Sequence, residues 1–113
     1  MNNQEIFDKV YQGLKAQGFK QSLLDGPGTI CMYRGEGGMK CAAGQLIPDE
    51  VYNVSMEERG IVYNIDWFKQ NFSPEALDFI RELQTIHDRS VTPETMKENL
   101  IEISRDAQVE VHD

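Results

Sequence analysis

Cys41 is the residue whose neighbours best suit nucleophilic chemistry. It follows Lys40, whose positive charge favours the thiolate, and it precedes a segment where we expect a helix, whose N-terminal dipole acts in the same direction. A nucleophilic thiol also needs a base within hydrogen-bond reach. One hypothesis is therefore a small Cys/His enzyme or ligand-binding protein, with Cys41 as nucleophile, His87 as base and either Asp88 or Asp49 as the acid that orients the imidazole ring.

A competing interpretation gives the same side chains structural roles. Free cysteines are commonly buried as small hydrophobic residues, and a histidine in the last turn of a helix interacts favourably with the terminal carbonyl groups. Cys31, Cys41, His87 and His112 show neither CxxC nor HxxxH spacing, which a structural zinc site would usually have. We therefore expect no metal and no other cofactor.

A second group of residues could bind rather than react. Aromatic and cationic side chains concentrate near the middle of an otherwise acidic chain, and two carboxylates follow them closely. These predicted binding residues are Tyr33, Arg34, Lys40, Asp49 and Glu50. The cations suit a carboxylate or phosphate on a small ligand, or they balance neighbouring acids. The two carboxylates are also explained as first-turn residues of a short helix over 48–52.

Length and charge limit the classes of function. The chain has 113 residues, which indicates a single domain over 1–113, and 19 acidic against 11 basic residues give a net charge of −8. Such a surface repels nucleic-acid phosphates but suits a basic protein partner, or serves solubility alone. No apolar run approaches the roughly 20 residues that span a membrane, and the N-terminus lacks the features of a signal peptide. We expect a cytoplasmic protein with reduced cysteines and no contact with membranes.

Helical signals surround this central region. Apolar residues recur at helical spacing between an Asn2 or Asn3 cap and Gly18, and Ser73 and Thr92 each precede a proline as N-cap residues of two further helices. Residues 42–46 could continue as a strand or begin a short helix, and we favour the helix. Ser55 matches a capping box with Glu58, a signal for a helix start that Gly60 interrupts. The segment from about 108 onward is predicted to be a short strand or a frayed tail.

The central region itself is predicted to be a β-hairpin. Residues 29–34 favour strands, 35–38 form a glycine-rich turn, 39–42 return as the second strand, and a further turn is expected at 25–28. A three-residue loop would place Cys31 opposite Cys41, where a disulfide is possible. A four-residue loop would place Cys31 opposite Ala42 instead. The predicted fold class is α+β, a small single domain, mostly helical, with a central β-hairpin packed by amphipathic helices.

Four short motifs resemble a family of small uncharacterised proteins encoded by tailed phages and prophages. They are C-x-Y-R-G at 31–35, K-C-A-A-G at 40–44, L-I-P-D-E at 46–50 and L-Q-x-x-H-D at 83–88. The resemblance implies a phage-type setting but no mechanism. It places in one recurring pattern the residues Cys41, Asp49, Glu50, His87 and Asp88.

Small size, strong acidity and the phage resemblance together predict a non-enzymatic protein. We expect it to act in the host cytoplasm by binding, and inhibiting, a host or defence protein with a basic surface, since charge complementarity speeds association and sharpens specificity. The Cys/His enzyme remains the alternative. Self-association into a homo-oligomer through an apolar stripe over 96–103 is a further prediction.

Overall fold

Helices make up the regular structure of the described residues, which are 1–23 and 31–113 of the computed structural model. Five α-helices and three short 3₁₀-helices (η) follow one another along this part of the chain. In order, they are α1 (Asn3–Ala16), η1 (Glu36–Gly38), η2 (Ala43–Leu46), α2 (Met56–Arg59), η3 (Val62–Asn64), α3 (Asp66–Asn71), α4 (Pro74–Arg89) and α5 (Pro93–Asp106). None of these helices has the length and apolar composition that crossing a membrane requires.

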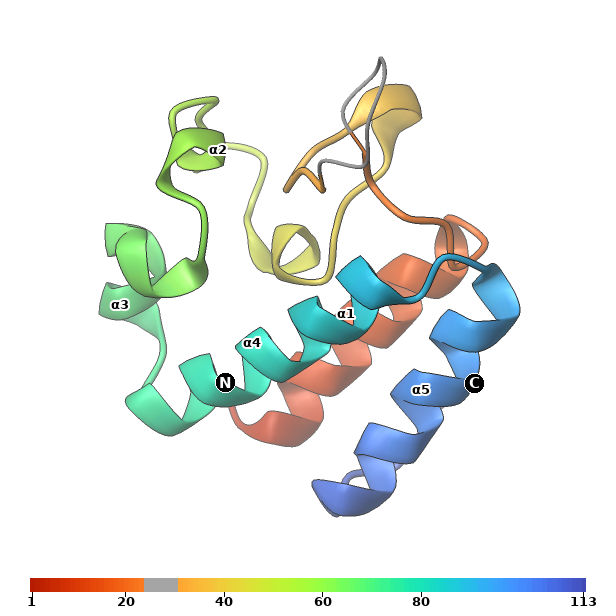
Figure 1. Ribbon diagram of the computed structural model, residues 1–113. Coiled ribbons are helices and arrows are strands. Elements are labelled where there is room, and N and C mark those ends of the chain that lie inside the picture. Colours follow the sequence, from red (N-terminus) through yellow and green to blue (C-terminus); the bar gives the residue numbers. More distant parts are fainter. Residues whose placement is uncertain (24–30) are drawn as a thin grey trace.

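The three long helices begin where the sequence predicts. At α1 the Asn2 side chain accepts the Glu5 N–H (2.8 Å), and the Glu5 carboxylate accepts the Asn2 N–H (3.0 Å). Ser73 caps α4 and Thr92 caps α5, each followed by a proline in the first turn. Helix α4 packs against both α1 and α5, and Figure 1 shows α4 running alongside α1, in nearly the same direction, with α5 to one side.

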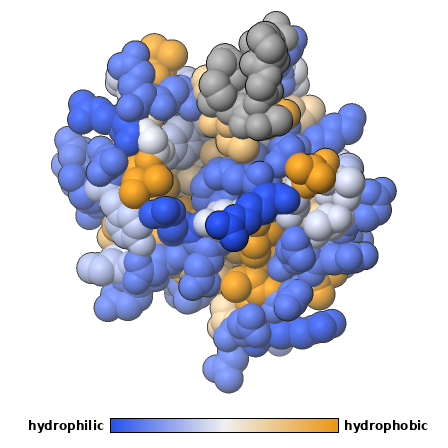
Figure 2. Space-filling model, in the orientation of Figure 1, coloured by the Kyte–Doolittle hydropathy of each residue, from blue (hydrophilic) through white to orange (hydrophobic). Residues whose placement is uncertain are grey.

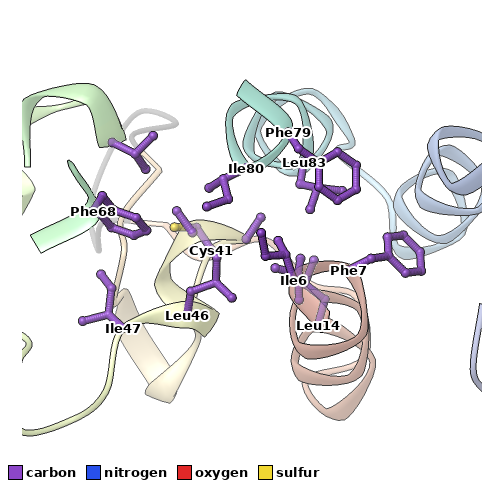
Figure 3. Close-up of a cluster of buried hydrophobic side chains, with 14 of the residues drawn as sticks. Ile6, Phe7, Leu14, Cys41, Leu46, Ile47, Phe68, Phe79, Ile80 and Leu83 are labelled. Atoms are coloured by element: carbon purple, nitrogen blue, oxygen red, sulfur yellow. The ribbon is translucent and has the colours of Figure 1, made fainter. Parts of the chain in front are cut away.

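The middle of the chain is packed into the core between these helices. Figure 3 shows apolar side chains of α1 and α4 meeting those of the η2 segment and α3. The labelled residues are Ile6, Phe7, Leu14, Cys41, Leu46, Ile47, Phe68, Phe79, Ile80 and Leu83. Space at η2 is so limited that a methyl group added at Gly44 would overlap the backbone carbonyl oxygen of Tyr33. Small residues are therefore required where the chain crosses the core.

The predicted α+β fold is wrong, because the described residues contain no strand. In the region of the predicted β-hairpin they form only two isolated antiparallel bridges, Leu23 with Cys31 and Arg34 with Lys40. Since Arg34 pairs with Lys40, the connection spans 35–39, longer than either predicted loop. The predicted turn at 25–28 and the start of the first predicted strand at 29–30 lie outside the described residues.

Side-chain acceptors replace the hydrogen bonds that a hairpin would need. The Glu57 carboxylate accepts the backbone N–H groups of Tyr33 (2.9 Å) and Arg34 (3.1 Å). Gly37 and Gly38 adopt positive φ values of 71° and 77°, which curl the connection into η1. The chain then turns into η2 directly after Cys41, so no second strand extends beyond the single bridge.

One short predicted helix and one predicted helix cap also differ from the structure. Residues 48–52 form a hydrogen-bonded turn, in which the N–H groups of Val51 and Tyr52 donate to the Pro48 carbonyl (3.0 and 3.1 Å), and not a helix. Ser55 makes no side-chain cap on α2, so the predicted capping box is wrong. Instead the Asn53 side chain accepts the Ser55 N–H at 2.9 Å.

The segment after α5 returns along α1. The Gln4 amide accepts the Glu110 N–H (2.7 Å) and donates to the Glu110 carbonyl (2.9 Å), and the Tyr11 hydroxyl donates to Asp113 (2.8 Å). Val109 and Val111 are half-buried against the core. Contacts with α1 rather than strand pairing therefore position this segment.

Candidate functional site

Cys41 is a core residue rather than a surface thiol. It is 1% exposed, and its sulfur accepts the Gly44 N–H at 3.3 Å. Burial raises the pKa of the Cys41 thiol well above its ordinary value, and the bond from Gly44 offsets only part of this effect. Cys41 is therefore protonated at neutral pH, and none of the hydrogen bonds among the described residues joins it to His87.

His87 is fully buried near the C-terminal end of α4, and both of its ring nitrogens are engaged. Its Nε2 accepts the Ser22 backbone N–H at 2.9 Å, and its Nδ1 lies 2.9 Å from Asp88 Oδ1. Because an N–H group points at Nε2, the ring proton must be on Nδ1, from where it donates to Asp88. No lone pair is left to accept a proton from a thiol. The imidazole instead ties the segment before residue 23 to α4.

Asp88 gathers three hydrogen bonds at the end of α4. His87 and the Gln84 amide (2.7 Å) donate to Oδ1, and the Cys31 thiol also donates to this carboxylate. Burial alone would raise the pKa of Asp88, but the bonds from His87, Cys31 and Gln84 together hold it below its ordinary value. Burial and the hydrogen bond to Asp88 raise the pKa of the Cys31 thiol to about 12. The structure thus brings Asp88 together with Cys31 and His87, and this thiol is a donor rather than an activated nucleophile.

The cluster of Cys31, His87 and Asp88 has the composition of a metal site but not its hydrogen-bond chemistry. One ligand atom from each residue lies within 4.8 Å of the others. A metal bound at His87 Nδ1 would move the ring proton to Nε2, where it would face the Ser22 N–H. Two donors would then oppose each other in a fully buried position, at a high energetic cost. These three residues therefore fit a hydrogen-bonded network and do not fit a metal ion.

The two predicted cations, Arg34 and Lys40, share one predicted carboxylate. Asp49 lies 2.8 Å from the Arg34 guanidinium and 3.7 Å from the Lys40 ammonium. Arg34 also donates to the Ile47 carbonyl (3.0 Å) and lies over the Tyr52 ring, 4.5 Å from its centre. The structure therefore brings Arg34, Lys40 and Asp49 together as an internal network.

The other two predicted binding residues lie apart from this network. Tyr33 is buried, and its hydroxyl donates to the Gly60 carbonyl. Burial raises the pKa of the Tyr33 phenol well above its ordinary value. Glu50 is exposed on the surface. Neither residue joins Arg34 and Lys40 in a shared binding surface.

Sequence reasoning missed Glu57, whose carboxylate holds together the segments around Tyr33 and Tyr52. Besides the Tyr33 and Arg34 N–H groups, its carboxylate accepts the Tyr52 hydroxyl at 2.6 Å. Charge-assisted bonds of this kind are about twice as strong as neutral ones. Glu57 lies 24 residues from Tyr33, so no local signal in the sequence marked this contact.

A cleft of about 490 Å³ lies beside Glu57 and the cluster of Cys31, His87 and Asp88. Helix α4 forms one wall, and the segments at 31–33 and 60–62 form another. Its apolar lining includes Met32, Cys41 and Val62, while Arg81, Thr85 and Arg89 line it from α4. A volume of this size suits a small molecule. The two arginines lie outside every motif that the sequence analysis singled out, and only their eight-residue spacing on a helix could have indicated a shared face.

Comparison with known proteins finds no matching family model, no similar curated protein and no similar solved structure. The functional argument therefore depends on the side chains themselves.

Proposed function

We propose that the protein acts by binding another protein, and that its partner presents a basic surface. The observation that supports this is the acidic stripe of α5, which we define as Glu94, Glu98, Glu102 and Asp106. All four are exposed, and none has a Lys, Arg or His nitrogen within 4.0 Å among the described residues. Because they follow one another at four-residue spacing, they share one broad face of the helix.

The acidic stripe has an energetic cost in the free protein. Like charges four residues apart destabilise a helix by about 0.2–0.5 kcal/mol per pair, so three successive pairs cost about 1 kcal/mol. A cationic partner would relieve that repulsion and would be attracted over long range by the net charge of −8. On the face in Figure 2, hydrophilic side chains cover most of the surface and hydrophobic ones form separate patches, which suits an encounter governed by charge.

The apolar side of α5 is used inside the molecule. Met96 and Leu100, in the predicted self-association stripe, are fully buried. The outward face thus leaves charge, rather than apolar area, for recognition. By resemblance, the proposed partner is a host or defence protein, and the proposed effect is its inhibition in the host cytoplasm.

An affinity capture from bacterial lysate at low salt tests this proposal. The test variant reverses three charges of the acidic stripe, E98K/E102K/D106K, where lysines also suit the C-terminal end of the helix dipole. The control, E36K/E50K/E58K, makes the same charge change at exposed positions outside α5. We expect the wild type and the control to retain one basic protein, and the stripe variant to lose it.

Retention should also decrease as salt is added, because surface charges are screened. Two outcomes would overturn the proposal. One is that the wild type retains no protein above background at low salt. The other is that the stripe variant retains the same protein as well as the wild type does.

A further inference from the structure

Two arginines of α4, Arg81 and Arg89, line the cleft, and neither takes part in an ion pair among the described residues. Two carboxylates, Glu57 and Asp88, line the same cleft and keep their negative charge, but their oxygens already accept internal hydrogen bonds. Glu57 accepts three, and Asp88 accepts bonds from His87, Gln84 and Cys31. Both arginines are exposed at the cleft. Arg81 lies over the Tyr63 ring, 5.8 Å from its centre, and the donors of both guanidinium groups are not bound to a carboxylate in the described residues.

We propose that this cleft binds a small organic anion, in which a carboxylate or phosphate group is attached to an apolar body. A guanidinium presents a planar fork of donors that matches both acid groups. Thr85 lies between the two arginines on α4, and its hydroxyl donates to the Arg81 carbonyl (3.0 Å), which leaves its oxygen free to accept. The apolar body would lie against Met32 and Val62.

The protein's net charge sets the conditions under which this site works. A charge of −8 repels anions over long range. At an ionic strength of about 0.15 M, however, charges more than about 8 Å apart are largely screened, while direct contacts with a guanidinium persist. The site therefore recognises its ligand by contact. It is independent of the proposed protein partner, which is attracted by the opposite charge on another helix, so either proposal can fail alone.

Nuclear magnetic resonance titration of the whole chain at about 0.15 M salt tests the site. The probes are phenylacetate, phenyl phosphate and phenylacetamide, the last being a neutral analogue of the first. We expect both acids to give saturable shifts in the backbone amides of Ile61, Val62 and Thr85, and the amide to give none. The acid that binds more tightly identifies which acid group the natural ligand carries.

Three variants locate the binding on the arginines. R81Q/R89Q should weaken binding of the tighter acid by about tenfold or more, because it removes both forks. R81K/R89K keeps the charge and should give an intermediate affinity. R105Q removes an exposed arginine from α5, outside the cleft, and should bind within about twofold of the wild type.

Three results would overturn the inference. They are the absence of saturable shifts with either acid, equal binding of phenylacetamide, and a loss in R105Q as large as that in R81Q/R89Q. Because all three positions are exposed, the variants are expected to fold, and their unperturbed amide spectra would show that they do.

Discussion

Replacing His87 with leucine separates a structural role from a catalytic one. His87 is fully buried, and leucine has a similar volume, so the change removes polar contacts while largely preserving packing. The Ser22 N–H would lose its acceptor at 2.9 Å, in a residue that is itself 0% exposed. Leaving a buried donor unpaired costs about 1–3 kcal/mol.

The second lost contact adds less. The Asp88 carboxylate would lose the imidazole N–H, but its side chain is 41% exposed and keeps the Gln84 amide, so solvent replaces much of the bond. We count this loss as below about 1 kcal/mol, which gives a total of about 1–4 kcal/mol for His87→Leu. For a domain with a stability of about 5–15 kcal/mol, this is a large fraction.

Urea denaturation followed by circular dichroism measures the effect, since the midpoint and slope give the free energy of unfolding. His87→Gln is the informative partner variant, because the amide oxygen can accept the Ser22 N–H in place of Nε2 and should recover part of the loss. The matched control is His112→Leu at the exposed second histidine, where little change is expected. A His87→Leu protein within about 1 kcal/mol of the wild type, or a glutamine variant equally destabilised, would refute the reasoning.

Four further perturbations follow from the same contacts. Gly44→Ala should cost more than about 2 kcal/mol because its methyl group meets rigid backbone, whereas Gly13→Ala should be tolerated because it meets a movable glutamine side chain; urea melts compare the two. Glu57→Gln places an amide donor among three donors and should lower the unfolding free energy by about 2–3 kcal/mol in the same assay. The pKa of Asp88 is lowered in the folded state, so the contribution of its carboxylate to folding stability is complete above the ordinary value of 3.8 and is lost as pH falls below it. The difference in unfolding free energy between the wild type and Asp88→Asn should therefore narrow below that pH. A difference that stays constant would contradict the assignment. Cys31, with a pKa of about 12, should react with iodoacetamide at pH 7.5 at least about tenfold more slowly than free cysteine, and faster in Asp88→Asn, as mass spectrometry would show.

Local sequence signals predicted the parts of the fold that depend on local chemistry. The start of α1 is determined by a side chain three residues from its partner, and Ser73 and Thr92 each cap a helix three residues ahead. Such contacts form within one turn, so the residue pattern alone indicates them. The positive φ of 70° at Gly18, just beyond the end of α1, belongs to the same class.

The β-hairpin failed as a prediction because its backbone donors are taken by a distant residue. The strand propensity of 31–34 reflects only the local preference of these residues. The Glu57 carboxylate binds the Tyr33 and Arg34 N–H groups from 24 and 23 residues away. Ser55 illustrates the same limit. Its predicted capping partner was Glu58, whereas the neighbouring Glu57 is the residue that makes the hydrogen bonds. A weak preference for extended backbone thus remained, without the ladder that would make it a sheet.

The candidate site shows a similar division. Sequence reasoning grouped His87 with Asp88 correctly, because they are adjacent, but it paired them with Cys41 rather than Cys31. The contacts that hold the early part of the chain against α4 include the bond between Ser22 and His87, which lie 65 residues apart, and spacing in the sequence cannot reveal such a contact. The same holds for the Arg34–Asp49 pair, whose members were both predicted to bind ligands and instead bind each other.

Most chemistry-bearing residues of the four motifs are thus occupied by the protein's own structure. Arg34 binds Asp49 and the Ile47 carbonyl, although its buried Nε has no hydrogen-bond partner, His87 holds the Ser22 backbone, and Cys41 is sealed in the core. A side chain whose hydrogen bonds are satisfied internally gains little from a new partner, because binding must first break them. Recognition should therefore come from charged groups that folding leaves without an ion-pair partner. In the described residues these include Arg81 and Arg89 at the cleft and the acidic stripe of α5, all outside the motifs, and variants there should alter binding while leaving the fold intact.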